Sequence, residues 1–120
     1  MRWVMVRFIC MTLAKATDEL NEVLRDAEDR LAALNLGVAA EIALSDCVHL
    51  RFGKHGAGWA LLCIRGDQTD PIVSASRRVR VEAAQALPRL RAALLETATT
   101  QEAAVRFAVL EARKFLASLR

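Results

Sequence analysis

Aromatic side chains are scarce in this chain, at 5% of the residues. The hydrophobic core must therefore be built mainly from Leu, Val, Ile and Ala, which proteins also bury readily. Alanine-rich helices can approach one another closely, so this composition favours a fold with a helical layer. The chain has 120 residues, and we expect a single domain over residues 1–120.

Cysteines are few and odd in number. The three, Cys10, Cys47 and Cys63, cannot form a complete disulfide framework, so we expect a cytoplasmic protein in a reducing compartment. Long apolar runs are also missing, because no stretch approaches the ~18 apolar residues of a membrane span. Arg7 interrupts the apolar start of the chain before it reaches the length of a signal peptide. The sequence thus predicts no membrane contact.

A clear helical period follows the first residues. Apolar residues recur every seven positions on one face, at Leu13, Leu20, Ala27 and Leu34. Thr12 suits the start of a helix and Gly37 the position just after its end, so a long helix over 12–35 is predicted. Residues 1–11 alternate only loosely, and they fit either a short strand or a loosely attached N-terminal extension.

The apolar period then changes to two, which indicates strands. Apolar and polar residues alternate over 38–44 and 48–52, whereas 59–65 is apolar on both faces, as in an inner strand. After a turn at 67–71, residues 72–76 fit a short fourth strand. Because only turns separate these segments, they predict an antiparallel meander of about four strands.

Helical spacing returns at residue 77. Segments 77–96 and 100–118 each carry an apolar face, and Pro88 predicts a kink or a restart in the first of them. Thr99 and Glu102 have the spacing of a capping box, which predicts a new helix start there. The expected fold is therefore α+β: a long N-terminal helix, the meander, and two C-terminal helices packed on one sheet face.

The glycine-rich segment 53–58 raises the question of a phosphate-binding loop. Such a loop lies between a strand and a helix, where N–H groups and a lysine converge on the anion. Here Lys54 precedes most of the glycines and a strand follows, so a β-hairpin is the better interpretation. Folding the chain about His55 and Gly56 places six apolar residues on one face, in the pairs Phe52–Trp59, Leu50–Leu61 and Val48–Cys63.

Spacing does not support a catalytic or metal site elsewhere. Cys47, His49 and Cys63 lack the second close pair of ligands that zinc sites usually have. No nucleophile elbow or other local signature joins a serine to a histidine. We therefore expect no metal site, no cofactor and no enzymatic activity.

The strongest polar signal is a group of arginines in the helix predicted from residue 77. On a helical wheel they lie away from the apolar face and suit phosphate binding; the group is Arg77, Arg78, Arg80, Arg89 and Arg91. This face has no aromatic residues to stack on single-stranded bases, and no helix-turn-helix glycine turn is present. Two interpretations stay open, a solvated arginine face and a nucleic-acid-binding surface.

The long first helix and the last helix both carry more apolar surface than one sheet face needs, and in the last helix Phe107, Leu110 and Phe115 widen the stripe. Spare apolar surface in a small protein favours a partner, most simply a second copy. We therefore expect a small non-catalytic interaction or regulatory protein that forms a homodimer. The alternative is a nucleic-acid-binding protein that uses the arginine-rich helix 77–91.

Overall fold

The computed structural model describes the backbone of residues 2–119 and the side chains of residues 12–119. It confirms the α+β class and the antiparallel meander, whose strands lie in the order β1-β2-β3-β4. Along the chain the elements are α1 (Arg2–Ala33), β1 (Ala40–Ala43), β2 (Val48–His55), β3 (Gly58–Arg65), β4 (Gln68–Pro71), the short 3₁₀ helix η1 (Ile72–Ser74) and α2 (Arg77–Ser118).

The β2–β3 hairpin confirms that the glycine-rich segment is a turn between strands, but its predicted register is wrong by two residues. Phe52 lies opposite Leu61 and not opposite Trp59, because the two turn residues are Gly56 and Ala57. Gly56 has a φ of 64°, a left-handed conformation that glycine adopts without a Cβ clash. A shift of two residues keeps every side chain on its predicted face, and the Phe52 and Trp59 rings stack diagonally with centroids 5.7 Å apart.

The predicted fourth strand over 72–76 is wrong, and β4 lies over the residues that were expected to form a turn. Gly66, with a φ of 58°, makes a second tight turn, so that Gln68 pairs directly with Arg65. The four residues of β4 are all exposed, as befits a short polar edge strand. Ile72, only 2% exposed, enters the core from η1.

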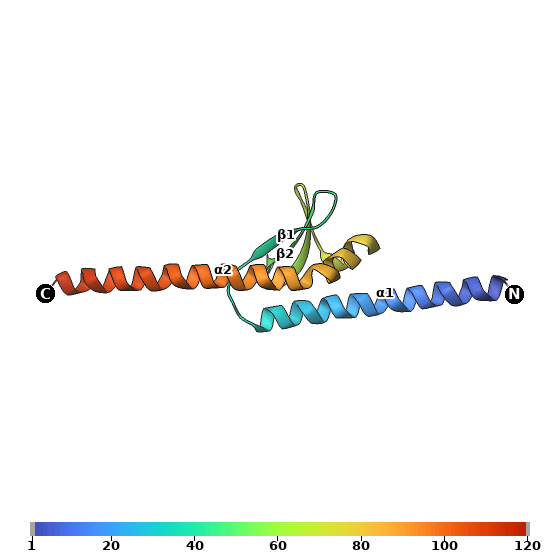
Figure 1. Ribbon diagram of the computed structural model, residues 1–120, viewed down its shortest axis with the longest axis horizontal. Coiled ribbons are helices and arrows are strands. Elements are labelled where there is room, and N and C mark those ends of the chain that lie inside the picture. The colour runs from blue at the N-terminus through green and yellow to red at the C-terminus, as the bar shows by residue number, and fades with distance from the viewer. Residues whose placement is uncertain (1, 120) are drawn as a thin grey trace.

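The two predicted C-terminal helices are one continuous helix, α2. Thr99 does not begin a new helix; its hydroxyl donates to the carbonyl of Leu95 at 2.9 Å, inside α2. Pro88 also lies within α2, where it removes one backbone donor, and the helix bends in its first part (Figure 1). Ser76 caps the start of α2, because its hydroxyl accepts the N–H of Val79 at 3.3 Å.

The N-terminal helix is longer than predicted, since α1 already includes residues 2–11. A strand over these residues is therefore wrong, and their side chains lie outside the described part of the chain. The helix ends at Ala33, and Asn35 and Gly37 both have positive φ, of 51° and 69°. The left-handed conformation expected at Gly37 is thus confirmed, and Asn35 adds a second left-handed residue between α1 and the sheet.

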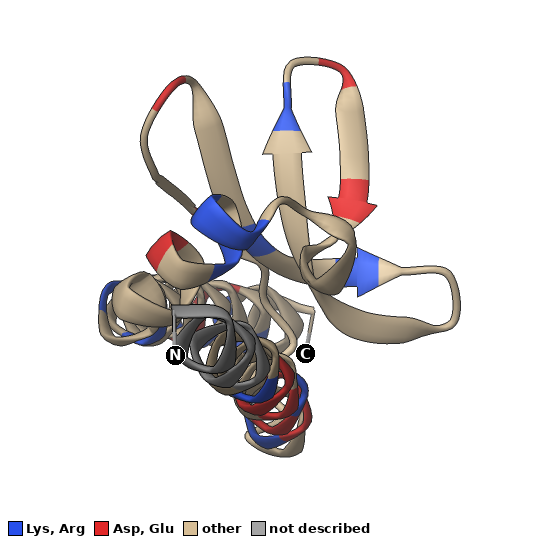
Figure 2. Cartoon of the chain, turned by 90° about the vertical axis from the view of Figure 1, so that its right-hand side faces the viewer, with Lys and Arg blue, Asp and Glu red and all other residues tan. Residues whose placement is uncertain are grey.

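Both helices pack on the same face of the sheet, as Figure 2 shows along the long axis. The core there is formed by side chains of 0–1% exposure from both helices and the sheet: Leu24, Leu90, Leu94, Leu50 and Leu61. Polar contacts also join the helices to the sheet and to its β1–β2 turn. The Glu28 carboxylate accepts the N–H of Leu61 at 2.8 Å, and the Ser45 hydroxyl donates to the Glu82 carboxylate at 2.7 Å.

The molecule is much longer than it is wide, with extents of 88 × 27 × 24 Å and a Cα radius of gyration of 20.5 Å. A compact chain of this length has a radius of gyration of about 14 Å. Figure 1 shows the reason: α1 and α2 run in the same direction but are displaced along the long axis. As a result α1 extends past the sheet at one end and α2 extends past it at the other.

Candidate interaction surface

The end of α2 is a free helix, which we call the arm (residues 99–119). Every side chain of the arm is exposed, including large apolar ones such as Phe107 and Leu119, at 65% and 66%. Most helices in proteins owe their stability to the packing of an apolar face against a neighbour rather than to intrinsic propensity. The arm therefore has the apolar surface of a packed helix without a neighbour in its own chain.

The apolar residues of the arm do not all lie on one side. Five of them continue the side of α2 that packs in the core, and we call this set the arm stripe: Val105, Val109, Ala112, Leu116 and Leu119. Of the residues predicted for a dimer surface, Phe115 borders the arm stripe. Phe107 and Leu110 are three residues apart and share another side of the helix. All three are exposed.

The sequence reveals the apolar spacing of the arm stripe, but it does not predict that the stripe is exposed. Its spacing predicts a helix face that packs on the sheet, because the break expected at Thr99 would allow the last helix to fold back. In the structure α2 continues straight, and the sheet has ended where the arm begins (Figure 1). The exposed stripe therefore follows from the continuity of α2.

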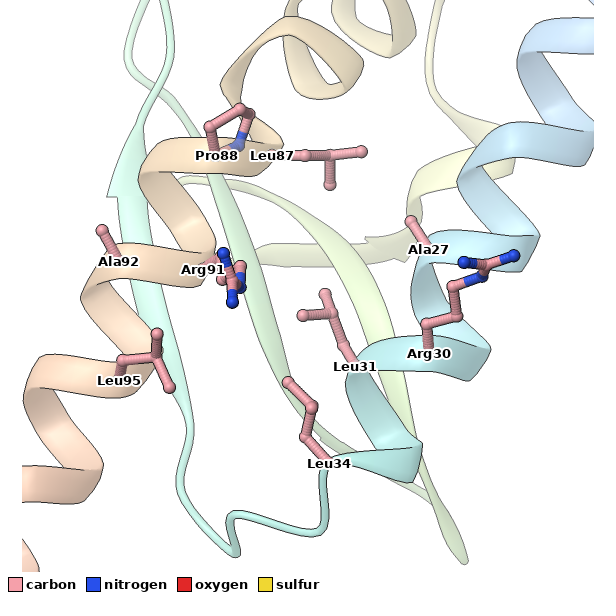
Figure 3. Close-up of a pocket in the computed structure, with 9 residues that line it drawn as sticks. All are labelled: Ala27, Arg30, Leu31, Leu34, Leu87, Pro88, Arg91, Ala92 and Leu95. Carbon is pink, nitrogen blue, oxygen red and sulfur yellow. The ribbon is translucent and has the colours of Figure 1, made fainter.

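A groove of about 520 Å³ lies between α1 and α2, close to the point where the arm begins. Figure 3 shows Leu31 of α1, Leu34 just after its end and Leu87 of α2 pointing into the space between the two helices. Leu95 lines the groove on the arm side, and both Leu34 and Leu95 are exposed, at 49% and 41%. The groove thus adds exposed apolar side chains next to the start of the arm.

The five arginines are divided among different sides of α2. Arg80 turns toward α1, where its Nη1 donates to Asn21 Oδ1 at 2.6 Å. Its Nε is buried without a hydrogen-bond partner in the described structure. Arg91 lines the groove, while Arg77 is exposed.

The other two arginines contact the β1–β2 region. Arg78 forms an ion pair with Asp46, and Arg89 donates to the carbonyl of Ala43 at 3.4 Å. Three of the five arginines therefore have partners within the chain, which leaves less free positive charge than the sequence indicates.

For this reason we predict only weak binding of nucleic acid, with a dissociation constant no tighter than ~10⁻⁵ M at physiological salt, as in non-specific contacts. Replacing Arg77, Arg78 and Arg89 by glutamine would lower the steepness of the salt dependence and leave the melting temperature nearly unchanged, since exposed ion pairs contribute little. A fluorescence titration with labelled DNA and RNA measures both. Sub-micromolar binding that the triple variant abolishes would instead establish the nucleic-acid-binding function.

The remaining candidates are not brought together. Cys63 is buried in the core, whereas Cys47 is exposed in the β1–β2 turn, and His49 lies 3.3 Å from Glu41 on the other face of the sheet. Among the side chains of residues 12–119, no three metal-ligating groups gather at one point. Within the described chain, no helix is long and apolar enough to cross a membrane.

Comparison with known proteins adds no functional assignment. No protein family matches the chain, and no curated protein or solved structure is significantly similar to it. The function must therefore be argued from the geometry of the molecule itself.

Proposed function

We propose that this chain is a non-catalytic interaction protein that works as a homodimer, and that the arm is its self-association surface. The observation that carries the proposal is the arm stripe, an amphipathic helix face with no neighbour in its own chain. Large exposed apolar patches on soluble proteins commonly mark interaction sites. A second copy is the simplest partner, because two-fold dimers are by far the commonest protein assemblies.

The surface area of the chain supports the proposal. Its accessible surface is 9002 Å², whereas a compact monomer of this mass exposes about 6,400 Å². An interface of ordinary size buries about 800 Å² on each partner. The excess is therefore large enough for a stable dimer interface, even though the exposed residues 12–16 of α1 contribute part of it.

Sedimentation velocity over a range of protein concentrations tests this function. We expect a dimer of about twice the 13.2 kDa chain mass at micromolar concentration, with dissociation only on dilution. A chain that remains a monomer from nanomolar to high micromolar concentration would contradict the proposal.

A further inference from the structure

We infer that two copies of the chain pair their arms side by side and antiparallel. Each arm would lie beside the arm of the other copy, in line with the α1 helix of that copy. The inference rests on the proposed self-association and specifies its geometry. In Figure 1 α1 ends beside α2 where the arm begins, and past that point the same side of α2 has no neighbour. The second arm would fill this place.

The sequence of the arm has the repeat that such pairing needs. Residues of the arm stripe are separated alternately by four and three positions, and this spacing continues back through Glu102 to Ala98 and Leu95. Apolar residues at this spacing form the seam of a two-helix coiled coil. Glu102 is the only charged residue of the seam. From Leu95 to Leu119 the seam is about 36 Å long at 1.5 Å per residue.

In an antiparallel register centred near residue 107, every seam position of one copy faces a seam position of the other copy. Small residues then lie opposite larger ones, which fills the interface without gaps. The facing pairs would be Leu95 with Leu119, Ala98 with Leu116, Glu102 with Ala112, and Val105 with Val109. The end of each arm would then reach the exposed Leu34 and Leu95 at the groove of the other copy.

A parallel pair of arms is less favourable for two reasons. It would place Glu102 of one copy directly opposite Glu102 of the other, and like charges at a shared layer repel. It would also set Ala98 and Ala112 against themselves, leaving layers without large side chains. In the antiparallel pair Glu102 faces only Ala112, and its carboxylate keeps its 2.7 Å ion pair with Arg106 at the edge of the seam.

Neighbouring residues of the arm provide a matched pair of variants. Val109 lies in the seam and Leu110 does not, although Leu110 is the more exposed, at 57% against 41%. Val109→Glu would bury two unpaired charges at the paired layers and weaken self-association by at least about 100-fold. Leu110→Glu introduces the same charge on another side and leaves association nearly unchanged. Glutamate favours helices, so neither variant unfolds the arm, which circular dichroism checks.

Disulfide cross-linking tests the direction of the arms, in a chain with Cys10 and Cys47 replaced by serine. Antiparallel pairing predicts that a Val105→Cys chain and a Val109→Cys chain each fail to cross-link alone, whereas an equimolar mixture forms a disulfide-linked heterodimer. Cross-linking of either chain with itself would overturn the antiparallel arrangement. A dimer unaffected by Val109→Glu would place self-association elsewhere, and a monomeric parent chain would refute the proposed function itself.

Discussion

Replacing Leu90 by alanine is expected to lower the free energy of unfolding by about 3 kcal/mol, within the usual range for a buried leucine. Leu90 has 0% exposure and belongs to the core cluster between the sheet and the helices. Removing its isobutyl group loses buried apolar area and leaves a cavity that the rigid layers only partly close. Since small domains are stable by only about 5–15 kcal/mol, this loss is a large fraction of the total. Urea unfolding followed by circular dichroism measures it.

Leu110→Ala is the matched control, because it makes the same chemical change in the same helix. Leu110 is 57% exposed and lies outside the seam, so its truncation should change the free energy of unfolding by no more than about 0.5 kcal/mol. Equal losses in the two variants would mean that the arm is packed in the monomer and that the described core is incomplete.

Ending the chain after Ala98 is expected to remove self-association while the domain stays folded. The removed arm is exposed over its whole length, whereas the described core residues all lie between Leu24 and Leu94. The shortened chain loses nearly the whole seam, so its association constant should fall by at least about 100-fold. Its melting temperature should also become independent of protein concentration, as for a monomer.

Sedimentation velocity and thermal melts of the shortened chain measure these two effects. A shortened chain that is unfolded would show that the arm supports the core through contacts absent from the described structure. A shortened chain that still dimerises would assign self-association to another surface, such as the exposed side of α1 around Leu13 and Val23.

The elements with strong apolar periods are the ones that the sequence predicts correctly. Alternation over 48–52 identifies β2 and the face that enters the core, and the apolar run over 59–65 identifies β3 as an inner strand. Both patterns arise from burial, because the residues on the buried face of a strand or helix recur with the period of that element. The seven-residue repeat from Leu13 to Leu34 identifies most of α1 for the same reason.

Strand β4, the continuity of α2 and the groove depend on contacts between distant residues or on small energy differences, which the local order of apolar and polar residues does not show. Strand β4 is polar and exposed, so only its pairing with β3 defines it. Threonines at 97, 99 and 100 resemble a helix start, but they cost a helix interior only a fraction of a kcal/mol each, and α2 continues through them. The groove combines Leu31 and Leu87, which are distant in sequence and meet only through the fold.

The most direct test of arm pairing is a distance between two copies. A spin label is attached at Ser118→Cys, an exposed position near the end of the arm, in the chain with Cys10 and Cys47 replaced by serine. Antiparallel arms centred near residue 107 place the two labels about 33 Å apart along the axis, from 1.5 Å per residue. Pulsed electron spin resonance is expected to show this intermolecular distance. A separation near 10 Å, or no intermolecular distance at all, would contradict the account.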